Sequence, residues 1–295
     1  MTAVQTAPVS DRTGALAGME LRRYARHPVF LIGAVATAIT TVMSVAKVTD
    51  DIYGPPVIPA FFLGVFGMVV GFRLTRSLER SAEAMTSAPV SMQTRIRALL
   101  LACLLPGALG LCAGIAMLTV PDAEGSWVYG TWAGHERLAI VLGQTAVASL
   151  GGPLLGIAAA RWLRFPGAVV VPIVAVVTWV IVGNGWSASN QDSTGWLIAR
   201  LFSPFAFFTT LNTDHGPHRV ESWRGEPWFF LVWLVLLCVA TAIVALLKGA
   251  EGDARTSLRR ALAITVVAAL ASLTLAVTTG SDHATERSPA GVTRI

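Results

Sequence analysis

The sequence predicts an all-α polytopic membrane protein with about seven transmembrane helices and a cytoplasmic N-terminus. Of its 295 residues, 54% are hydrophobic and only 13% are charged, about half the charged fraction of a typical soluble domain. Seven stretches without a charged residue or a histidine are long enough to cross about 30 Å of hydrocarbon. These stretches are residues 28–46, 56–72, 98–120, 138–160, 165–183, 227–247 and 261–279.

The spans divide the chain into three parts. Residues 1–27 are predicted to form a cytoplasmic N-terminal segment, residues 28–279 a transmembrane domain, and residues 280–295 an exposed polar tail. A long polar stretch precedes the first span, which lacks a clear small-residue cleavage site. We therefore expect this span to be a signal anchor and not a cleaved signal peptide.

The basic residues predict the orientation. With the N-terminus inside, the cytoplasmic segments hold 15 of the 22 basic residues, and the outer segments hold 11 of the 17 acidic residues. This is the positive-inside bias, and an odd number of spans then places the tail outside. Only Lys47 and Lys248 are lysines, and Ala and Val are abundant, a bias that fits a GC-rich bacterial genome. We expect a multi-pass protein of the bacterial plasma membrane.

The predicted spans contain no group that could drive transport or catalysis. Ion-coupled transporters and intramembrane enzymes place ionisable side chains near the bilayer midplane, and here no span carries one. The chain also lacks the phosphate-binding pattern G-x-x-x-x-G-K-[ST] and a cytoplasmic segment large enough for an ATPase domain. Any energy source for transport is therefore expected in a partner.

Three glycine pairs are spaced by four residues within the spans. Glycines at this spacing allow helix backbones to approach closely. We expect packing within one chain, and a dimer face is the alternative. The pairs are Gly67 with Gly71, Gly110 with Gly114, and Gly152 with Gly156.

A short amphipathic helix is predicted over residues 16–26, directly before the first span. Its apolar side carries Ala17, Leu21 and Tyr24, and His27-Pro28 changes the direction of the chain. Such a helix lies in the headgroup layer with its arginines on anionic lipid. Simple orientation by positive charge is the alternative role. The predicted interfacial anchors are Arg22, Arg23 and Arg26.

Residues 76–97 concentrate charge between two apolar spans and also have helical periodicity. An apolar stripe follows i, i+4, i+8 and i+11 spacing, at Leu74, Leu78, Ala82 and Met85. Opposite charges are spaced by three residues, at Arg76 with Glu79 and at Arg80 with Glu83. Pro89 ends the predicted helix of residues 74–86, and Ser91 can cap the next one. The segment suits docking on a soluble partner; a solvated connector is the alternative.

Two segments resemble the ABC-2 type permease subunits of actinobacterial ABC exporters. They are "ELRRYARHPVFLIG", which is similar to the basic helix before the first span of that family, and "ERSAEAMTSAPVSMQTRIRALLLA", which is similar to its cytoplasmic loop between spans two and three. The similarity extends over about residues 17–250. Ser81 and Ala82 stand where the family often has glycine, and the seventh span exceeds the usual six.

The resemblance implies a half-transporter in which two permease subunits, identical or different, pair with two ATPase subunits. ATP and Mg would bind to the partner, with no cofactor in this chain. The residues that would form the coupling helix against the ATPase are Arg76, Glu79, Arg80, Glu83 and Met85. The predicted function is ATP-driven export of a hydrophobic or amphipathic substrate. The alternative is a non-transporting integral-membrane scaffold or accessory protein.

The outer segment of residues 184–226 is the largest connection. Its aromatic middle is broken at Pro204 and is predicted to lie at the membrane interface. Asp214, His215 and His218 could bind a metal by residue type, and an enzyme would depend on them. A solvated turn is the alternative, and we predict no metal site and no catalytic residue.

Overall fold

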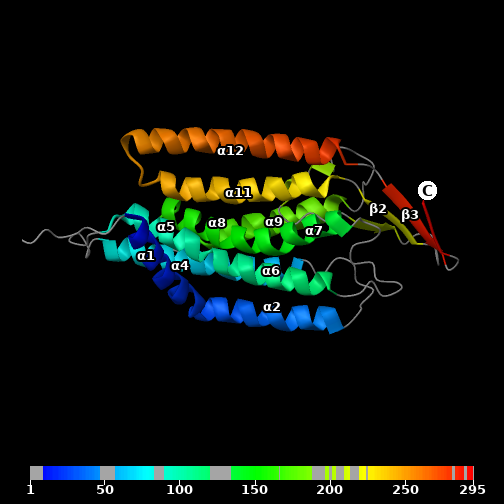
Figure 1. Ribbon diagram of the computed structural model, residues 1–295, viewed down its shortest axis with the longest axis horizontal. Coiled ribbons are helices and arrows are strands. Elements are labelled where there is room, and N and C mark those ends of the chain that lie inside the picture. Colours follow the sequence, from blue (N-terminus) through cyan, green and yellow to red (C-terminus); the bar gives the residue numbers. More distant parts are fainter. Residues whose placement is uncertain are drawn as a thin grey trace, which may run out of the picture.

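The protein is a bundle of helices that run side by side, with a small β-sheet at one end (Figure 1). The computed structural model describes residues 9–46, 57–82, 90–119, 134–165, 167–187, 197–198, 201–203, 209–212, 219–223, 225–280, 283–288 and 291–294. The helices are α1 (Val9–Ala25), α2 (Pro28–Ala46), α3 (Val57–Pro59), η1 (Ala60–Val65), α4 (Phe66–Ala82), α5 (Met92–Ala102), α6 (Leu104–Leu118), α7 (Gly134–Leu142), η3 (Gly143–Val147), α8 (Ala148–Trp162), α9 (Val170–Ser187), α11 (Pro227–Leu247) and α12 (Gly252–Thr278). The strands are β1 (Thr209–Asn212), β2 (Arg219–Trp223), β3 (His283–Ser288) and β4 (Gly291–Arg294).

Helices occur at all seven predicted spans, and this confirms the helical class. Five helical stretches are long and apolar enough to cross a membrane, at Ala60–Ser81, Met92–Leu118, His135–Trp162, Pro227–Leu247 and Gly252–Thr278. Helix α2 passes the same test together with α1, at a bend of 69°. The apolar part of α9, Val170–Val182, is shorter. The number of spans and their orientation stay predictions.

The four strands form an antiparallel sheet that the sequence did not predict. The strand order is β1-β2-β3-β4, and Arg219 of β2 pairs with Arg287 of β3. The C-terminal tail is therefore joined to the large outer segment, at the end of the bundle opposite α1 (Figure 1). This agrees with the predicted placement of both segments on one side. The strands have only four to six residues and lie in polar sequence, so hydropathy does not reveal them.

Two helix starts are capped as their sequences suggest. Ser91 accepts a hydrogen bond from the backbone N–H of Thr94 at 3.2 Å, which confirms the predicted cap of α5. Helix α11 starts with Pro227, and the carboxylate of Glu226 accepts a bond from the N–H of Trp228 at 3.5 Å. Both caps satisfy backbone donors that have no partner inside the helix.

The glycine pairs allow helices of the same chain to pack at backbone distance. A Cβ atom on Gly152 would lie 2.0 Å from the carbonyl oxygen of Gly64, and one on Gly156 would lie 2.0 Å from that of Met68. The remaining pairs make similar contacts, Gly71 with Pro153 and Gly110 and Gly114 with Thr145. The predicted role of packing within one chain is confirmed. Helix α8 is thereby held tightly against η1 and α4.

Helix α1 is present as predicted, but it packs differently. Tyr24 is fully buried, its hydroxyl donates to the carbonyl oxygen of Gly67 at 3.4 Å, and its ring meets Phe30 edge-on at 5.0 Å. Leu21, predicted on the same side, is exposed. The two residues lie three apart on one continuous helix and so share a side, but only Tyr24 is buried in the bundle. The reason is that α1 packs against α5 of its own bundle, which the periodicity of α1 alone does not indicate.

Candidate functional site

The charged end of the bundle is the end where four predicted cytoplasmic segments meet (Figure 1). It comprises α1, the connection from α4 to α5, the connection from α8 to α9, and the connection from α11 to α12. Side chains join these segments directly. Arg23 of α1 donates to the hydroxyl of Ser77 on α4 at 2.7 Å, and Gln93 of α5 donates to the carbonyl of Leu246 on α11 at 2.9 Å. The predicted grouping of these connections at one end is therefore confirmed.

Donors from α5 and α8 cap the C-terminal end of α11. The indole N–H of Trp162 donates to the carbonyl of Val244, and the Nε of Arg161 donates to that of Ala245, each at 3.0 Å. Gln93 binds the next carbonyl. The last carbonyls of a helix have no partner within it and carry partial negative charge, so an arginine is well placed here. The sequence predicted for Arg161 only a role in setting the orientation of the protein. In the structure Arg161 is buried, with 4% of its surface exposed, and it joins α8 to the end of α11.

The predicted pair Arg76–Glu79 is confirmed, but both residues bind other parts of the same chain. Arg76 lies 3.4 Å from the carboxylate of Glu79, and its guanidinium also donates to the carbonyl of Leu163. The other carboxylate oxygen of Glu79 lies 3.9 Å from the ammonium of Lys248. The guanidinium of Arg76 additionally lies over the ring of Phe72, 5.5 Å from its centroid. This group joins α4 to the connections that follow α8 and α11.

The predicted coupling helix of residues 74–86 is not a separate helix in its described part. Helix α4 continues from the apolar span to Ala82 because no proline interrupts residues 66–82. Leu74 and Leu78 of the predicted stripe are buried in the core of the chain. That part of the stripe is therefore unavailable to a partner, which corrects the prediction from periodicity.

The remaining predicted site residues differ in exposure. Arg80 is exposed at the end of α4, as are Arg22 and Arg26 on α1. Arg23 is held by Ser77 and lies 3.8 Å from the carboxylate of Glu20. Several predicted residues lie outside the described part of the chain: Glu83, Met85, Asp214, His215 and His218. Within the described ranges, no three His, Cys, Asp or Glu residues are grouped as metal ligands.

Lys248 and His27 are among the groups at this end whose pKa values are shifted. Burial lowers the pKa of Lys248, Glu79 opposes this shift, and nearby arginines add to it. Burial also lowers the pKa of His27, between α1 and α2, with further contributions from Arg73 and Arg23. The Nδ1 atom of His27 accepts a hydrogen bond from the N–H of Val29 at 3.3 Å. A neutral imidazole at this elbow therefore caps the first turn of α2.

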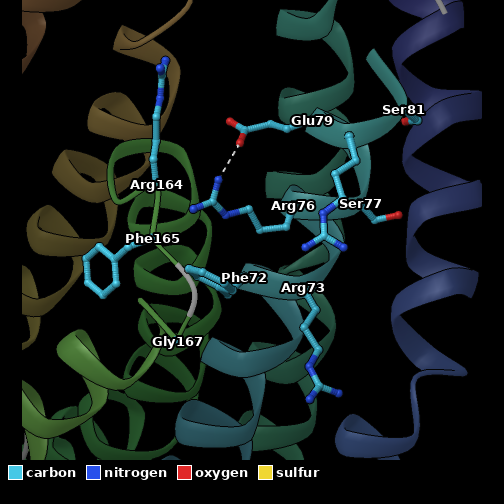
Figure 2. A pocket seen from close by; sticks show the side chains of 10 residues that line it. Phe72, Arg73, Arg76, Ser77, Glu79, Ser81, Arg164, Phe165 and Gly167 are labelled. Carbon is cyan, nitrogen blue, oxygen red and sulfur yellow. Dashed lines mark hydrogen bonds and ion pairs between the residues drawn. The ribbon is translucent and has the colours of Figure 1, made fainter. Parts of the chain in front are cut away.

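A large cleft opens at the charged end, between α4 and the connection from α8 to α9 (Figure 2). Its volume is about 1090 Å³. Its lining combines guanidinium groups with two aromatic rings, and consists of Phe72, Arg73, Arg76, Ser77, Glu79, Arg80, Ser81, Arg164, Phe165 and Gly167. We call this the basic cleft. An anion is the ligand that its charge favours.

A second cavity lies inside the bundle and is almost entirely apolar. It has a volume of about 160 Å³ and is lined by residues of η1, α4, η3, α8, α9 and α11. Pockets that enclose drug-sized ligands have volumes of about 300–1,000 Å³. This cavity is therefore too small for a large hydrophobic substrate within one chain.

Comparison of the chain with protein-family models, with curated proteins and with solved structures finds no match.

Proposed function

We propose that this protein is the membrane-spanning permease subunit of an ATP-driven exporter of the ABC-2 type, and that a separate ATPase subunit binds its charged end. The observation that carries the proposal is the convergence at this one end of the four predicted cytoplasmic segments, which together hold 15 of the 22 basic residues. By the positive-inside rule this end faces the cytoplasm, where ATP is available. Seven spans and a bacterial plasma membrane complete the proposed topology.

Helix α4 provides a direct path from the docking region to the membrane interior. It is continuous from Phe66 to Ala82 and so connects the exposed Arg80 with the glycine contacts of the bundle. A displacement of the end of α4 moves α8 with it, because Gly156 permits backbone contact with Met68. This rigid connection supports a coupling role for the end of α4, with Glu83 and Met85 as further proposed contacts.

The proposed substrate is hydrophobic or amphipathic, because the seven predicted spans contain no charged side chain that could bind a polar substrate. The small volume of the internal cavity favours a path between two permease subunits over a path within one. The second subunit is another copy or a related chain, and ATP with Mg binds in the ATPase partner.

The docking role is tested by reversing the charge of Arg80, which is exposed and has no hydrogen-bond or ion-pair partner among the described residues. We expect Arg80→Glu to lose most of its association with the co-expressed ATPase in affinity purification, because a basic docking contact becomes repulsive. Arg255→Glu is the matched control, since Arg255 is also exposed at this end but lies on α12. Unchanged association of Arg80→Glu would contradict the assigned contact. Glu79 is unsuitable because it binds Lys248.

A non-transporting scaffold or accessory protein is the second candidate. It is favoured by the binding of Arg76 and Glu79 to the chain's own connections, which makes the charged end rigid. ATP hydrolysis by the purified complex distinguishes the two candidates. An exporter is expected to show hydrolysis that its substrate stimulates, whereas a scaffold leaves the hydrolysis rate of its partner unchanged.

A further inference from the structure

Among the described residues that line the basic cleft, basic side chains outnumber acidic ones. Four arginines line it, and Glu79 is the one acidic residue among those lining residues that the structure describes. The carboxylate of Glu79 is already shared between Arg76 and Lys248. The lining arginines are Arg73, Arg76, Arg80 and Arg164. The described part of the cleft therefore carries a net positive charge, which favours an anionic ligand.

Two of these arginines are free to bind a ligand. Arg73 and Arg164 are exposed, and neither has a hydrogen-bond or ion-pair partner within the described part of the chain. Figure 2 shows that they come from two different elements, on either side of Arg76. Arg76 is fixed by the carbonyl of Leu163 and by Glu79, so it forms the rigid centre of the cleft. Guanidinium groups bind phosphate oxygens through charge-assisted hydrogen bonds, and four of them line the cleft.

The cleft also lies where apolar helices end. Phe72 is the last residue of the second charge-free stretch and Phe165 is the first residue of the fifth, and both line the cleft. The ring of Phe165 is half exposed. A ligand in the cleft therefore contacts guanidinium groups and hydrocarbon together, as a molecule at the headgroup level of a membrane does.

An apolar groove follows one face of α9, starting one turn beyond Gly167 of the cleft. It has a volume of about 720 Å³ and is lined by Val170, Val171, Val174, Ala175, Thr178, Trp179 and Val182. These residues extend over about 18 Å of helix. One leaflet contributes about half of a hydrocarbon thickness of about 30 Å, so the groove is long enough for one acyl chain.

We propose that the basic cleft binds the phosphate headgroup of an anionic membrane phospholipid such as phosphatidylglycerol, with one acyl chain along α9. A free phosphate would offer the same anionic group to the cleft. The apolar groove on α9 favours a lipid, because a free phosphate has no acyl chain to fill it. The proposal requires only that the helices lie in a membrane. It is therefore independent of ATPase binding, and each proposal can fail without the other.

The test uses the full-length protein in nanodiscs of phosphatidylcholine with or without phosphatidylglycerol, followed by native mass spectrometry of the lipid that stays bound after release into detergent. We expect selective retention of phosphatidylglycerol. The double variant Arg73→Gln/Arg164→Gln should weaken this retention about fivefold for each arginine removed. The charge-preserving variant Arg73→Lys/Arg164→Lys should retain most of the selectivity. Arg255→Gln/Arg259→Gln is the matched control at the same end of the bundle.

Two further measurements separate the lipid from other anions and from misfolding. Glycerol phosphate and inorganic phosphate, which have no acyl chain, should fail to displace the bound lipid at equal concentration. A photoactivatable phosphatidylglycerol should crosslink the wild-type chain within residues 164–182, a result that does not depend on any variant. Equal retention of both lipids, an equal loss in the control variant, displacement by phosphate alone, or crosslinks elsewhere would each overturn the proposal.

Discussion

Single glycines decide how closely α8 approaches its neighbours. Gly151 and Gly152 are adjacent in sequence, but their surroundings differ. A Cβ on Gly152 would lie 2.0 Å from the backbone oxygen of Gly64, whereas a Cβ on Gly151 would meet the sulfur of Cys238 at 3.5 Å. The first distance is impossible without moving a helix, and the second is an ordinary contact. Adding one methyl group therefore forces a helix to move at Gly152, whereas at Gly151 the same group fits into the available space.

We expect Gly152→Ala to destabilise the protein by about 1–3 kcal/mol, because the added methyl group forces α8 away from η1. The measurement is the midpoint of thermal unfolding in detergent. Gly151→Ala is the matched control and should change the midpoint little, since it adds a better helix former at a site with room. Equal midpoints for the two variants would contradict the close approach of Gly152 to Gly64.

At the scale of elements, the elbow between α1 and α2 depends on a neutral imidazole. His27 accepts a hydrogen bond from the N–H of Val29, and a proton on Nδ1 would remove this acceptor. The folded-state pKa of His27 is lowered below the ordinary 6.5, by burial first and then by Arg73 and Arg23. The folded protein therefore binds fewer protons here than the unfolded chain. The contribution of His27 to the free energy of unfolding therefore rises with pH up to about its ordinary pKa of 6.5, and it is lost as the pH falls below that pKa.

We accordingly predict that acidification from about pH 7.5 to about pH 5 loosens the elbow, within the range where histidine titrates. Hydrogen exchange of the amides in the first turn of α2 should increase over this range. His27→Asn keeps a capping oxygen without a titrating group, so its exchange should show less of this increase. An identical pH profile in wild type and His27→Asn would show that His27 does not control the elbow.

The helices show what the sequence determines and what it leaves open. Charge-free stretches predict where helices lie, because crossing hydrocarbon excludes charge whatever the neighbours are. The cap at Ser91 and the pair Arg76–Glu79 were also predictable, since both depend on residues within one turn. The apolar stripe of Leu74 and Leu78 was predicted to face an external partner, but it packs in the core of the same chain. Helical spacing of apolar residues is the same in both cases, so it cannot distinguish them. Arg161 as a helix cap was missed for a related reason: its acceptor, the carbonyl of Ala245, is 84 residues away.

At the scale of the whole molecule, the two ends of the bundle have different chemistry. The charged end collects arginines from four connections, and the other end carries the sheet that joins β2 to the C-terminal strands. The two ends are separated by the length of α12, about 40 Å for 27 residues. That length exceeds the hydrocarbon thickness of about 30 Å, so α12 is long enough for its two ends to lie on opposite sides of a membrane.

The orientation is tested with two introduced cysteines, one near each end of α12. Arg255 lies at the charged end and Thr279 directly follows the helix at the sheet end, and both are exposed. A Cys112→Ser background removes the exposed native thiol, whereas Cys103 and Cys238 are buried. In intact cells an impermeant maleimide should label Thr279→Cys and not Arg255→Cys, because the basic end faces inward. Both should be labelled after permeabilisation. The reverse pattern would invert the topology, and equal protection of both in intact cells would show that α12 does not cross.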